Sequence, residues 1–233
     1  SELVAAAASI PHAAQISAIS PRLITETVVN ISHDGENVMV PGVLYGMELG
    51  ADGAAINDLH IDAGRALTAA DVGAPVVALE KHFLDFYDLP AQGPVLLSGA
   101  SEVQQVASVI APEFFMVTTP EGGYMAESSL AAVFTSIETA QTLTDHADQA
   151  NDLLVILAPE ADHALVRAEL ETALEDAFPQ ISISSNAREN DPLYEVMYEA
   201  VSMNQAIYDI MVLMFMLGAM FGAFTLSNRI VEA

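Results

Sequence analysis

Residues 193–233, LYEVMYEAVSMNQAIYDIMVLMFMLGAMFGAFTLSNRIVEA, decide the architecture of this chain. No Pro or Gly interrupts the stretch between Pro192 and Gly218. In its first half, one helical stripe is formed largely by apolar side chains, namely Leu193, Val196, Met197, Ala200, Val201, Asn204 and Ile207. This spacing predicts a single helix over residues 193–228.

The second half of this helix contains a charge-free run from Ile210 to Leu226. Its 17 residues extend ~26 Å, and adding residues 207–209 and 227–228 brings the run to the ~30 Å hydrocarbon core of a bilayer. Arg229 follows, where a cytoplasmic flank places positive charge. The sequence therefore predicts a transmembrane span. The alternative is a buried helix of a soluble bundle, although an acidic protein would rarely leave such a helix without a charge on any face.

Two glycines in the span, Gly218 and Gly222, form a GxxxG motif. Residues four apart lie on one side of a helix, and small residues there let a second helix approach closely in lipid. We therefore predict that these two glycines are helix-packing residues.

The charge of the chain excludes several classes of function. Lys and Arg number 6 and Asp and Glu number 32 among 233 residues, so the net charge is −26. Such a chain cannot neutralise phosphates, which excludes nucleic-acid binding and docking of the main body onto anionic headgroups. There is no cysteine, so disulfides, thiolate chemistry and Cys-ligated zinc are excluded. The acidity is typical either of a salt-adapted surface or of an ordinary acidic domain.

The preceding residues, 1–192, alternate between strand and helix patterns and indicate an α+β body. We expect strands at 15–20, 23–32, 37–45, 74–79, 93–98, 102–110, 124–126, 151–158 and 181–184. We expect helices at 1–11, 80–87, 129–142 and 159–178, with an irregular Gly-rich stretch over 46–75. The last strand, helix and strand would form a βαβ-type unit.

Motifs of common enzyme active sites do not occur in the sequence. It has no HExxH, GxSxG, P-loop or GxGxxG pattern, and its six histidines show no metal-ligand spacing. We therefore predict no catalytic, cofactor-binding or metal-binding residue.

Several segments resemble, in the same order, segments of the MacB/FtsX-type ABC transporter permeases, which include the LolC/LolE lipoprotein-release pair. The segments are 16–22 (ISAISPR), 59–71 (LHIDAGRALTAAD), 109–115 (VIAPEFF), 134–143 (FTSIETAQTL), 151–157 (NDLLVIL) and 224–233 (FTLSNRIVEA). None of these strings is catalytic, and it is their order that carries the resemblance.

The resemblance implies a two-lobed extracytoplasmic α+β domain over residues 1–192 and a stalk and transmembrane helix over 193–233. A porter-like βαβ lobe would occupy about 12–45 and 147–190, and an inserted lobe would occupy about 46–146. The implied partners are a second permease copy or paired permease, membrane lipid, and a separate cytoplasmic ATPase that contacts segments outside this chain. No cofactor is implied, and the transported substrate is not indicated.

These expectations place residues 1–205 outside the cytoplasm and the span in the cell membrane. The protein would transmit ATPase-driven motion to export, extract or release a substrate. The alternatives are a single-span binding or sensor domain, an FtsX-like regulator of an extracytoplasmic partner, and a secreted enzyme. An enzyme would need a deep pocket with convergent polar groups and perturbed carboxylates. We also expect residues 1–195 to fold without ligand, metal or nucleotide and to hydrolyse no ATP.

Overall fold

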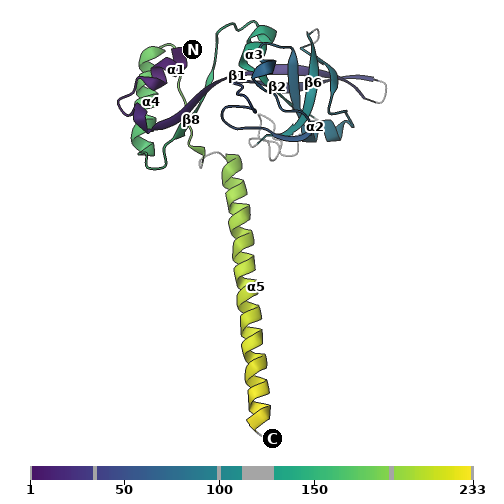
Figure 1. Cartoon of the computed structure of the whole chain (residues 1–233), viewed down its shortest axis with the longest axis vertical. Helices are drawn as coiled ribbons and strands as arrows, with labels where there is room; N and C mark the ends of the chain where they lie inside the picture. Colours follow the sequence, from purple (N-terminus) through teal and green to yellow (C-terminus); the bar gives the residue numbers. More distant parts are fainter. Residues whose placement is uncertain (1, 34–35, 99–100, 112–128, 189–191, 232–233) are drawn as a thin grey trace. The chain divides into compact units, whose positions relative to one another are not determined.

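The computed structural model describes residues 2–33, 36–98, 101–111, 129–188 and 192–231. The chain divides into two compact units, Ser1–Ser185 and Asn186–Ala233. We call the first unit the body and describe each unit by itself (Figure 1).

The body contains eight strands and several short helices. The strands are β1 (Ile16–His33), β2 (Glu36–Met47), β3 (His60–Gly64), β4 (Val76–Glu80), β5 (Gly93–Leu97), β6 (Ser101–Ile110), β7 (Ala131–Ser136) and β8 (Asp152–Leu157). The α-helices are α1 (Glu2–Ala8), α2 (Lys81–Phe86), α3 (Ile137–Thr144) and α4 (His163–Ala177), and short 3-10 turns lie at Ala13–Gln15 and Ala69–Asp71.

Six of the strands close into a small barrel. Going round the ring, β1 pairs with β2, β2 with β7, β7 with β4, β4 with β6, β6 with β5, and β5 again with β1. The β2–β7 and β4–β6 pairs are parallel and the other four are antiparallel. Because the ring is closed, each of these six strands pairs with a neighbour on both sides. The strand β3 lies outside the ring and pairs with β6.

Inward-pointing side chains fill the barrel, and Ile137 and Ala140 of α3 belong to the same core. Val40 and Leu44 of β2, both buried, alternate with Gly42 and Gly46 on the same inward face. The glycines let other backbone approach: a Cβ on Gly46 would lie 2.5 Å from the Ala140 Cβ in α3. The close packing of α3 on β2 therefore depends on this glycine.

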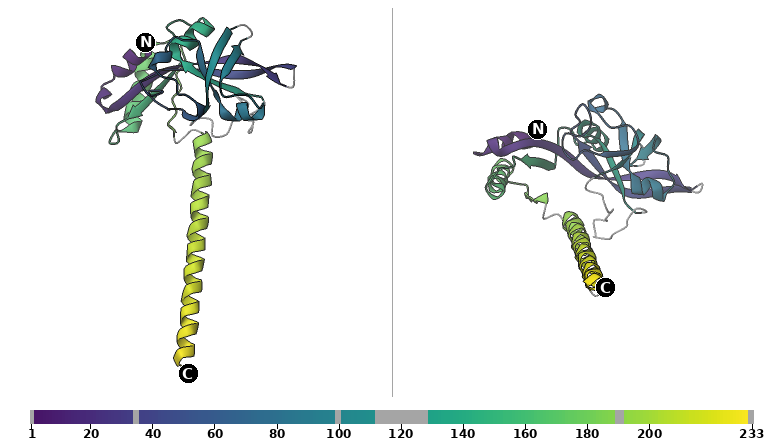
Figure 2. Two further views of the ribbon diagram at one scale, coloured as in Figure 1. Left: turned by 45° about the vertical axis from the view of Figure 1, so that its right-hand side comes forward. Right: turned by 60° about the horizontal axis from the view of Figure 1, so that its bottom comes forward.

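A second layer is built on the first half of β1. Residues 16–22 of β1 leave the barrel and pair antiparallel with β8. Helices α1 and α4 contact each other beside this two-stranded ladder (Figures 1 and 2). Arg22, where β1 passes from the ladder to the barrel, is buried and pairs with Asp152 at 2.7 Å. β1 is thus one continuous strand shared by the ladder and the barrel.

Asn151 closes the junction between ladder and barrel. Its side chain accepts from the Ile24 backbone N–H at 2.8 Å and donates to the Ile24 carbonyl at 2.7 Å. It thereby imitates one rung of a β-ladder at the point where β8 has not yet begun. The backbone N–H of Asn151 also donates to the Arg22 carbonyl at 3.1 Å.

Most of the expected body elements are confirmed, within a few residues at their ends. One difference lies at residues 15–32, where we expected two separate strands, 15–20 and 23–32. The structure has a single strand, β1, with Pro21 paired to Leu153. The fixed φ of proline is compatible with extended backbone, and its missing N–H is tolerated in a two-stranded ladder, where every strand is an edge.

The helix expected over 129–142 is wrong in its first half. Residues 131–136 form β7, which is buried along its whole length, and only residues 137–144 are helical. Ala131 and Val133 face the barrel interior, whereas Ala132 and Phe134 join a second cluster outside it. A strand covered on both faces is apolar at every position, so its apolar residues also match a helical spacing.

Two smaller corrections concern 181–184 and 60–64. The expected strand at 181–184 is absent, and the segment has no strand partner among the described residues. The βαβ-type unit is therefore incomplete. Conversely, β3 lies inside the stretch expected to be irregular, where its exposed, polar sequence gave no alternation. The brief strand expected at 124–126 falls outside the described residues.

The second unit contains α5 (Pro192–Val231), an unbroken helix of 40 residues. The single helix expected over 193–228 is confirmed. The residue limits of the two predicted lobes, 12–45 with 147–190 against 46–146, remain a prediction.

The basic side chains of the body are all engaged with carboxylates. Each of the four Lys and Arg residues before Ser185 forms an ion pair, namely Arg22–Asp152 (2.7 Å), Arg65–Asp71 (2.7 Å), Lys81–Asp62 (2.9 Å) and Arg167–Glu171 (3.1 Å). The remaining acidic residues far outnumber the cations, in keeping with the net charge of −26.

We predict that Gly46→Ala destabilises the body by about 1–3 kcal/mol, because the added methyl group would overlap Ala140 and force α3 away from β2. Urea unfolding of residues 1–195 measures the effect. Gly50→Ala is the matched control, since a Cβ there meets only the Gly53 carbonyl at 3.4 Å. Equal stability of the two variants would show that the contact is not tight.

We also predict that salt stabilises the body. Raising NaCl from 0.1 M to 1 M shortens the screening length from about 10 Å to about 3 Å and weakens the mutual repulsion of surface carboxylates. The melting temperature of residues 1–195 should rise with NaCl. The rise should be smaller when the exposed Glu102, Glu160 and Glu175 are replaced by Gln. A melting temperature independent of salt would contradict this expectation.

Candidate functional site: the C-terminal helix

The α5 helix is longer than a membrane span requires. Its 40 residues extend about 60 Å, twice the hydrocarbon thickness of a bilayer. Part of the helix must therefore lie outside the hydrocarbon core if the rest spans it. Asp209 and Arg229 bracket residues 210–228, a length of about 28 Å that matches one bilayer crossing.

Large apolar side chains cover the described surface of α5 and are exposed within its own unit. The exposed fraction in the second half runs from 45% for Leu217 to 75% for Phe215. The exposed residues are Tyr198, Val201, Met203, Ile207, Tyr208, Ile210, Met211, Val212, Leu213, Met214, Phe215, Met216, Leu217 and Met220. Such a surface marks a helix that is covered by lipid or by other helices.

One candidate span lies within α5, at Val201–Met220, and none of it is buried. By length and composition this stretch can cross a membrane. It overlaps the span expected from the sequence at residues 207–220.

Gly218, one of the two predicted packing residues, is open on the side where a side chain would project. An added Cβ would have no neighbour within 4 Å. Gly222 lies one turn further along the same helix. The space beside Gly218 is thus available to a second helix, and the packing role of the two glycines remains a prediction.

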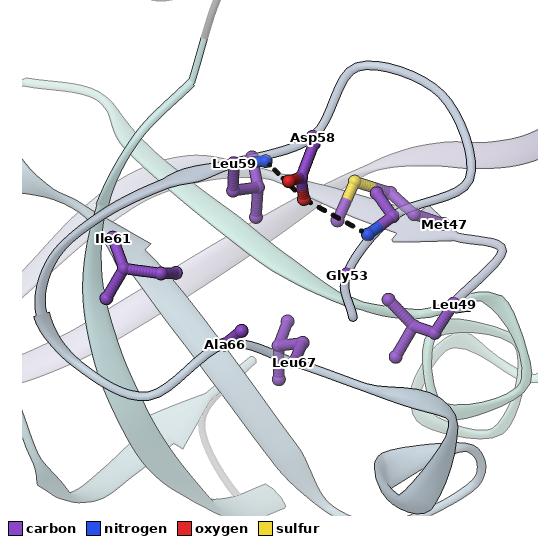
Figure 3. A pocket seen from close by; sticks show the side chains of 9 residues that line it. Met47, Leu49, Gly53, Asp58, Leu59, Ile61, Ala66 and Leu67 are labelled. Carbon is purple, nitrogen blue, oxygen red and sulfur yellow. Dashed lines mark hydrogen bonds between the residues drawn. The ribbon is translucent and has the colours of Figure 1, made fainter. Parts of the chain in front are cut away.

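One pocket in the described part of the body is too small for a substrate. A pocket beneath the loop after β2 has a volume of about 10 Å³, which admits at most a single water molecule (Figure 3). Figure 3 shows Asp58 turned to the surrounding backbone, and its carboxylate accepts from the backbone N–H groups of Ala54 and Leu59. The other lining side chains are apolar.

Two buried carboxylates in the body have shifted pKa values, but both are committed to local structure. Burial raises the pKa of the Glu80 carboxyl, while hydrogen bonds from His82 oppose the shift. Glu80 caps α2 by accepting from the backbone N–H groups of His82 (2.7 Å) and Phe83 (3.2 Å). Hydrogen bonds from Arg65 lower the pKa of Asp71, which also accepts from the Thr68 N–H at 3.0 Å. Neither carboxylate lines the pocket.

Metal-binding groups of three or more His, Asp or Glu side chains do not occur among the described residues.

Sequence reasoning missed two polar clusters that organise the body. One is the Asn151–Arg22 junction described above. The other joins Arg167 and Glu171 of α4 to Ser185, at the end of the body. Arg167 and Glu171 are recognisable as an i,i+4 pair, and every basic residue is conspicuous in so acidic a chain. Nothing in the sequence indicates that Ser185 joins them.

Comparison with known proteins identifies solved structures that have a similar fold. No family model and no curated protein matches the chain. The extracellular domain of the noncanonical ABC-type transporter YknZ from Gram-positive bacteria matches 76% of this chain and 83% of its own, with a TM-score of 0.54 and 12% identity. The periplasmic region of MacB from Actinobacillus actinomycetemcomitans matches 74% and 72%, with a TM-score of 0.50 and 13% identity.

This chain has the fold of the MacB and YknZ extracytoplasmic domains. The expected α+β class and the resemblance to the extracytoplasmic domain of an ABC transporter permease are thereby confirmed. At such low identity the MacB-like fold is shared while few side chains are, so the comparison assigns no role to an individual residue.

We predict that Gly218→Ile weakens association between α5 helices, because a bulky side chain at the open position would hold two backbones apart. Self-association of a 190–233 segment in bilayers, measured by energy transfer, reports the change. Gly222→Ile should act in the same direction. Ala219→Ile is the matched control, since it adds similar bulk on a different side of the helix. Equal effects at positions 218 and 219 would show that the glycines are incidental.

Proposed function

We propose that this chain is the extracytoplasmic part of an ABC transporter permease, in which α5 carries motion between a separate cytoplasmic ATPase and the body. The likeness of the fold to the MacB and YknZ domains is the observation that carries the proposal. The YknZ domain belongs to a noncanonical ABC-type transporter, and the other domain is the periplasmic region of MacB.

The continuity of α5 supports a mechanical role for it. A helix of 40 residues with no break from Pro192 to Val231 transmits displacement along its axis better than a linker would. No Pro or Gly interrupts it between Pro192 and Gly218. In the proposal, residues 210–228 span the cell membrane, Arg229 faces the cytoplasm, and residues 1–205 lie outside.

In the proposal, the body acts by binding and by conformational change, and it does not catalyse a reaction. It presents a closed barrel with a filled interior, and its shifted carboxylates are occupied in capping and ion pairing. ATP hydrolysis belongs in the proposal to a separate subunit. The permease would work as a dimer or as a pair of related permeases in contact with lipid, and the moved substrate is left open.

A single-span sensor is the second candidate, favoured by the one candidate span within the described residues. The two proposals differ in one respect: a permease must form a complex with a nucleotide-hydrolysing subunit, whereas a sensor need not.

Membrane topology gives the first test. Because this sequence contains no cysteine, a thiol reagent would label only the cysteine introduced into it. We expect Glu102→Cys, at an exposed site in β6, to react in intact cells with a maleimide that cannot cross membranes. Asn228→Cys should react only after the cells are opened. The unsubstituted protein is the control for background labelling. Labelling of both positions from the outside, or of neither, would contradict the proposed orientation.

Co-purification gives the second arm of the test. The full-length protein extracted in mild detergent should carry ATP hydrolysis with it, while residues 1–195 alone should have none. A correctly oriented protein without an associated ATPase would favour the sensor.

A further inference from the structure

The segment that leaves α4 at the end of the body has little secondary structure of its own. After α4 ends at Ala177, residues 178–187 contain no helix or strand. The Phe178 N–H bonds back to Leu174 and the Ile181 N–H bonds to Phe178, which closes the helix end. Extended backbone without a ladder is soft and would dissipate a displacement rather than pass it on.

One side of this segment nevertheless faces the body. Residues 183 and 185 are half-buried, while residues 182 and 184 are exposed. This alternation is the period of an extended chain lying on a surface.

Ser185 is the point at which α4 holds the segment. Arg167 in α4 donates from Nε to the Ser185 Oγ at 2.6 Å and from Nη2 to the Ser185 carbonyl at 2.8 Å. The Ser185 hydroxyl in turn donates to the Glu171 carboxylate, which also accepts from Arg167 at 3.1 Å. Both the backbone and the side chain of one residue are thus fixed by the planar fork of one guanidinium.

The negative charge of Glu171 stabilises this cluster. Hydrogen bonds from Ser185 and from Arg167 lower the pKa of the Glu171 carboxyl, so it is ionised and accepts from both. We call the three residues Arg167, Glu171 and Ser185 the α4 clamp.

α4 itself is tied firmly to the rest of the body. The Glu169 carboxylate accepts from the His12 backbone N–H at 3.0 Å and contacts its Nδ1 at 2.6 Å. At the start of the helix, the Asp162 N–H donates to the Gln15 side-chain oxygen at 2.8 Å. Val166 and Leu174 are buried beneath α4. A displacement delivered to α4 therefore reaches the start of β1, and β1 continues into the barrel.

We propose that Arg167 is the positioning residue that couples α5 to the body, by fixing Ser185 to α4 through the α4 clamp. The inference rests on the proposed function and deepens it. Ser185 is the last residue of the body before the chain continues toward α5, so the α4 clamp joins this end of the body to α4 directly and keeps residues 178–184 from absorbing a displacement that reaches Ser185.

The test uses the full-length protein with its ATPase and spin labels on introduced cysteines. Asn186→Cys reports the segment and Glu175→Cys reports α4, and both sites are exposed. In the otherwise unsubstituted chain we expect ATP to change the spectra of both labels. With Arg167→Ala, the Asn186 label should gain mobility and keep its ATP response, while the response of the Glu175 label is lost.

Arg65→Ala is the matched control. Arg65 is also a half-exposed arginine in an ion pair of the body, but its partner is Asp71. Its removal should leave both ATP responses in place. Ser185→Ala is the second variant, in case Arg167→Ala does not fold. It keeps only the bond to the Ser185 carbonyl and should reduce the Glu175 response in the same direction.

The outcomes separate the two proposals. No ATP response at either label in the unsubstituted chain overturns the proposed function and this inference with it. ATP responses at both labels that persist in Arg167→Ala and Ser185→Ala overturn the inference alone. Loss of the Glu175 response in Arg65→Ala as well also overturns it, because the effect would then be general loosening of the body.

Discussion

The strand β1 is the element on which the rest of the body depends. Its first seven residues pair with β8, and the remainder pairs with β2 and, over two residues, with β5. The ladder beneath α1 and α4 and the barrel beside it therefore share one backbone. Arg22 and Asn151 fix the passage between them with an ion pair and a pair of backbone hydrogen bonds. Because extended backbone is stiff along its length when paired on both halves, the ladder cannot tilt without carrying the barrel strand with it.

The elements predicted well from the sequence are those whose pattern of apolar residues fits only one type of secondary structure. The β1–β2 hairpin, β5, β6, β8 and α4 each have a turn signal, an alternation or a helical stripe that no other arrangement imitates. β7 is buried on two faces by two separate clusters, so its local pattern is ambiguous and only the closed barrel explains it. The segment 181–184 has the composition of a strand but pairs with no strand among the described residues, and the presence of a partner is a property of the whole fold. The candidate site shows the same difference. The long apolar helix α5 can be predicted because its residues are consecutive in the sequence. The α4 clamp could not be predicted, because residues 167, 171 and 185 come together only in the folded structure.

The body has few basic residues, and each of its Lys and Arg side chains pairs with a particular carboxylate. An exposed ion pair contributes about 0–1 kcal/mol to stability, because solvent screens it and two side chains must be ordered to form it. Here the four cations before Ser185 lie at the strand junction, the loop before β4, the start of α2 and the α4 clamp. Arg22 is the most enclosed of them, and its guanidinium also lies 5.9 Å from the ring centroid of Tyr45. The ion pairs that Lys and Arg make in the body lie at these four points.

The pairing of β1 with β8 also determines when the protein can fold. Ile16 pairs with Leu157, and His12 bonds to a residue 157 positions later in the chain. Contacts this distant in sequence make loop closure slow, and they cannot form until both partners have been synthesised. At ribosomal rates of ~5–20 residues per second, the first strand waits on the order of ten seconds for its partner. During that interval β2 can already pair with the second half of β1, whereas residues 16–22 still lack their partner strand.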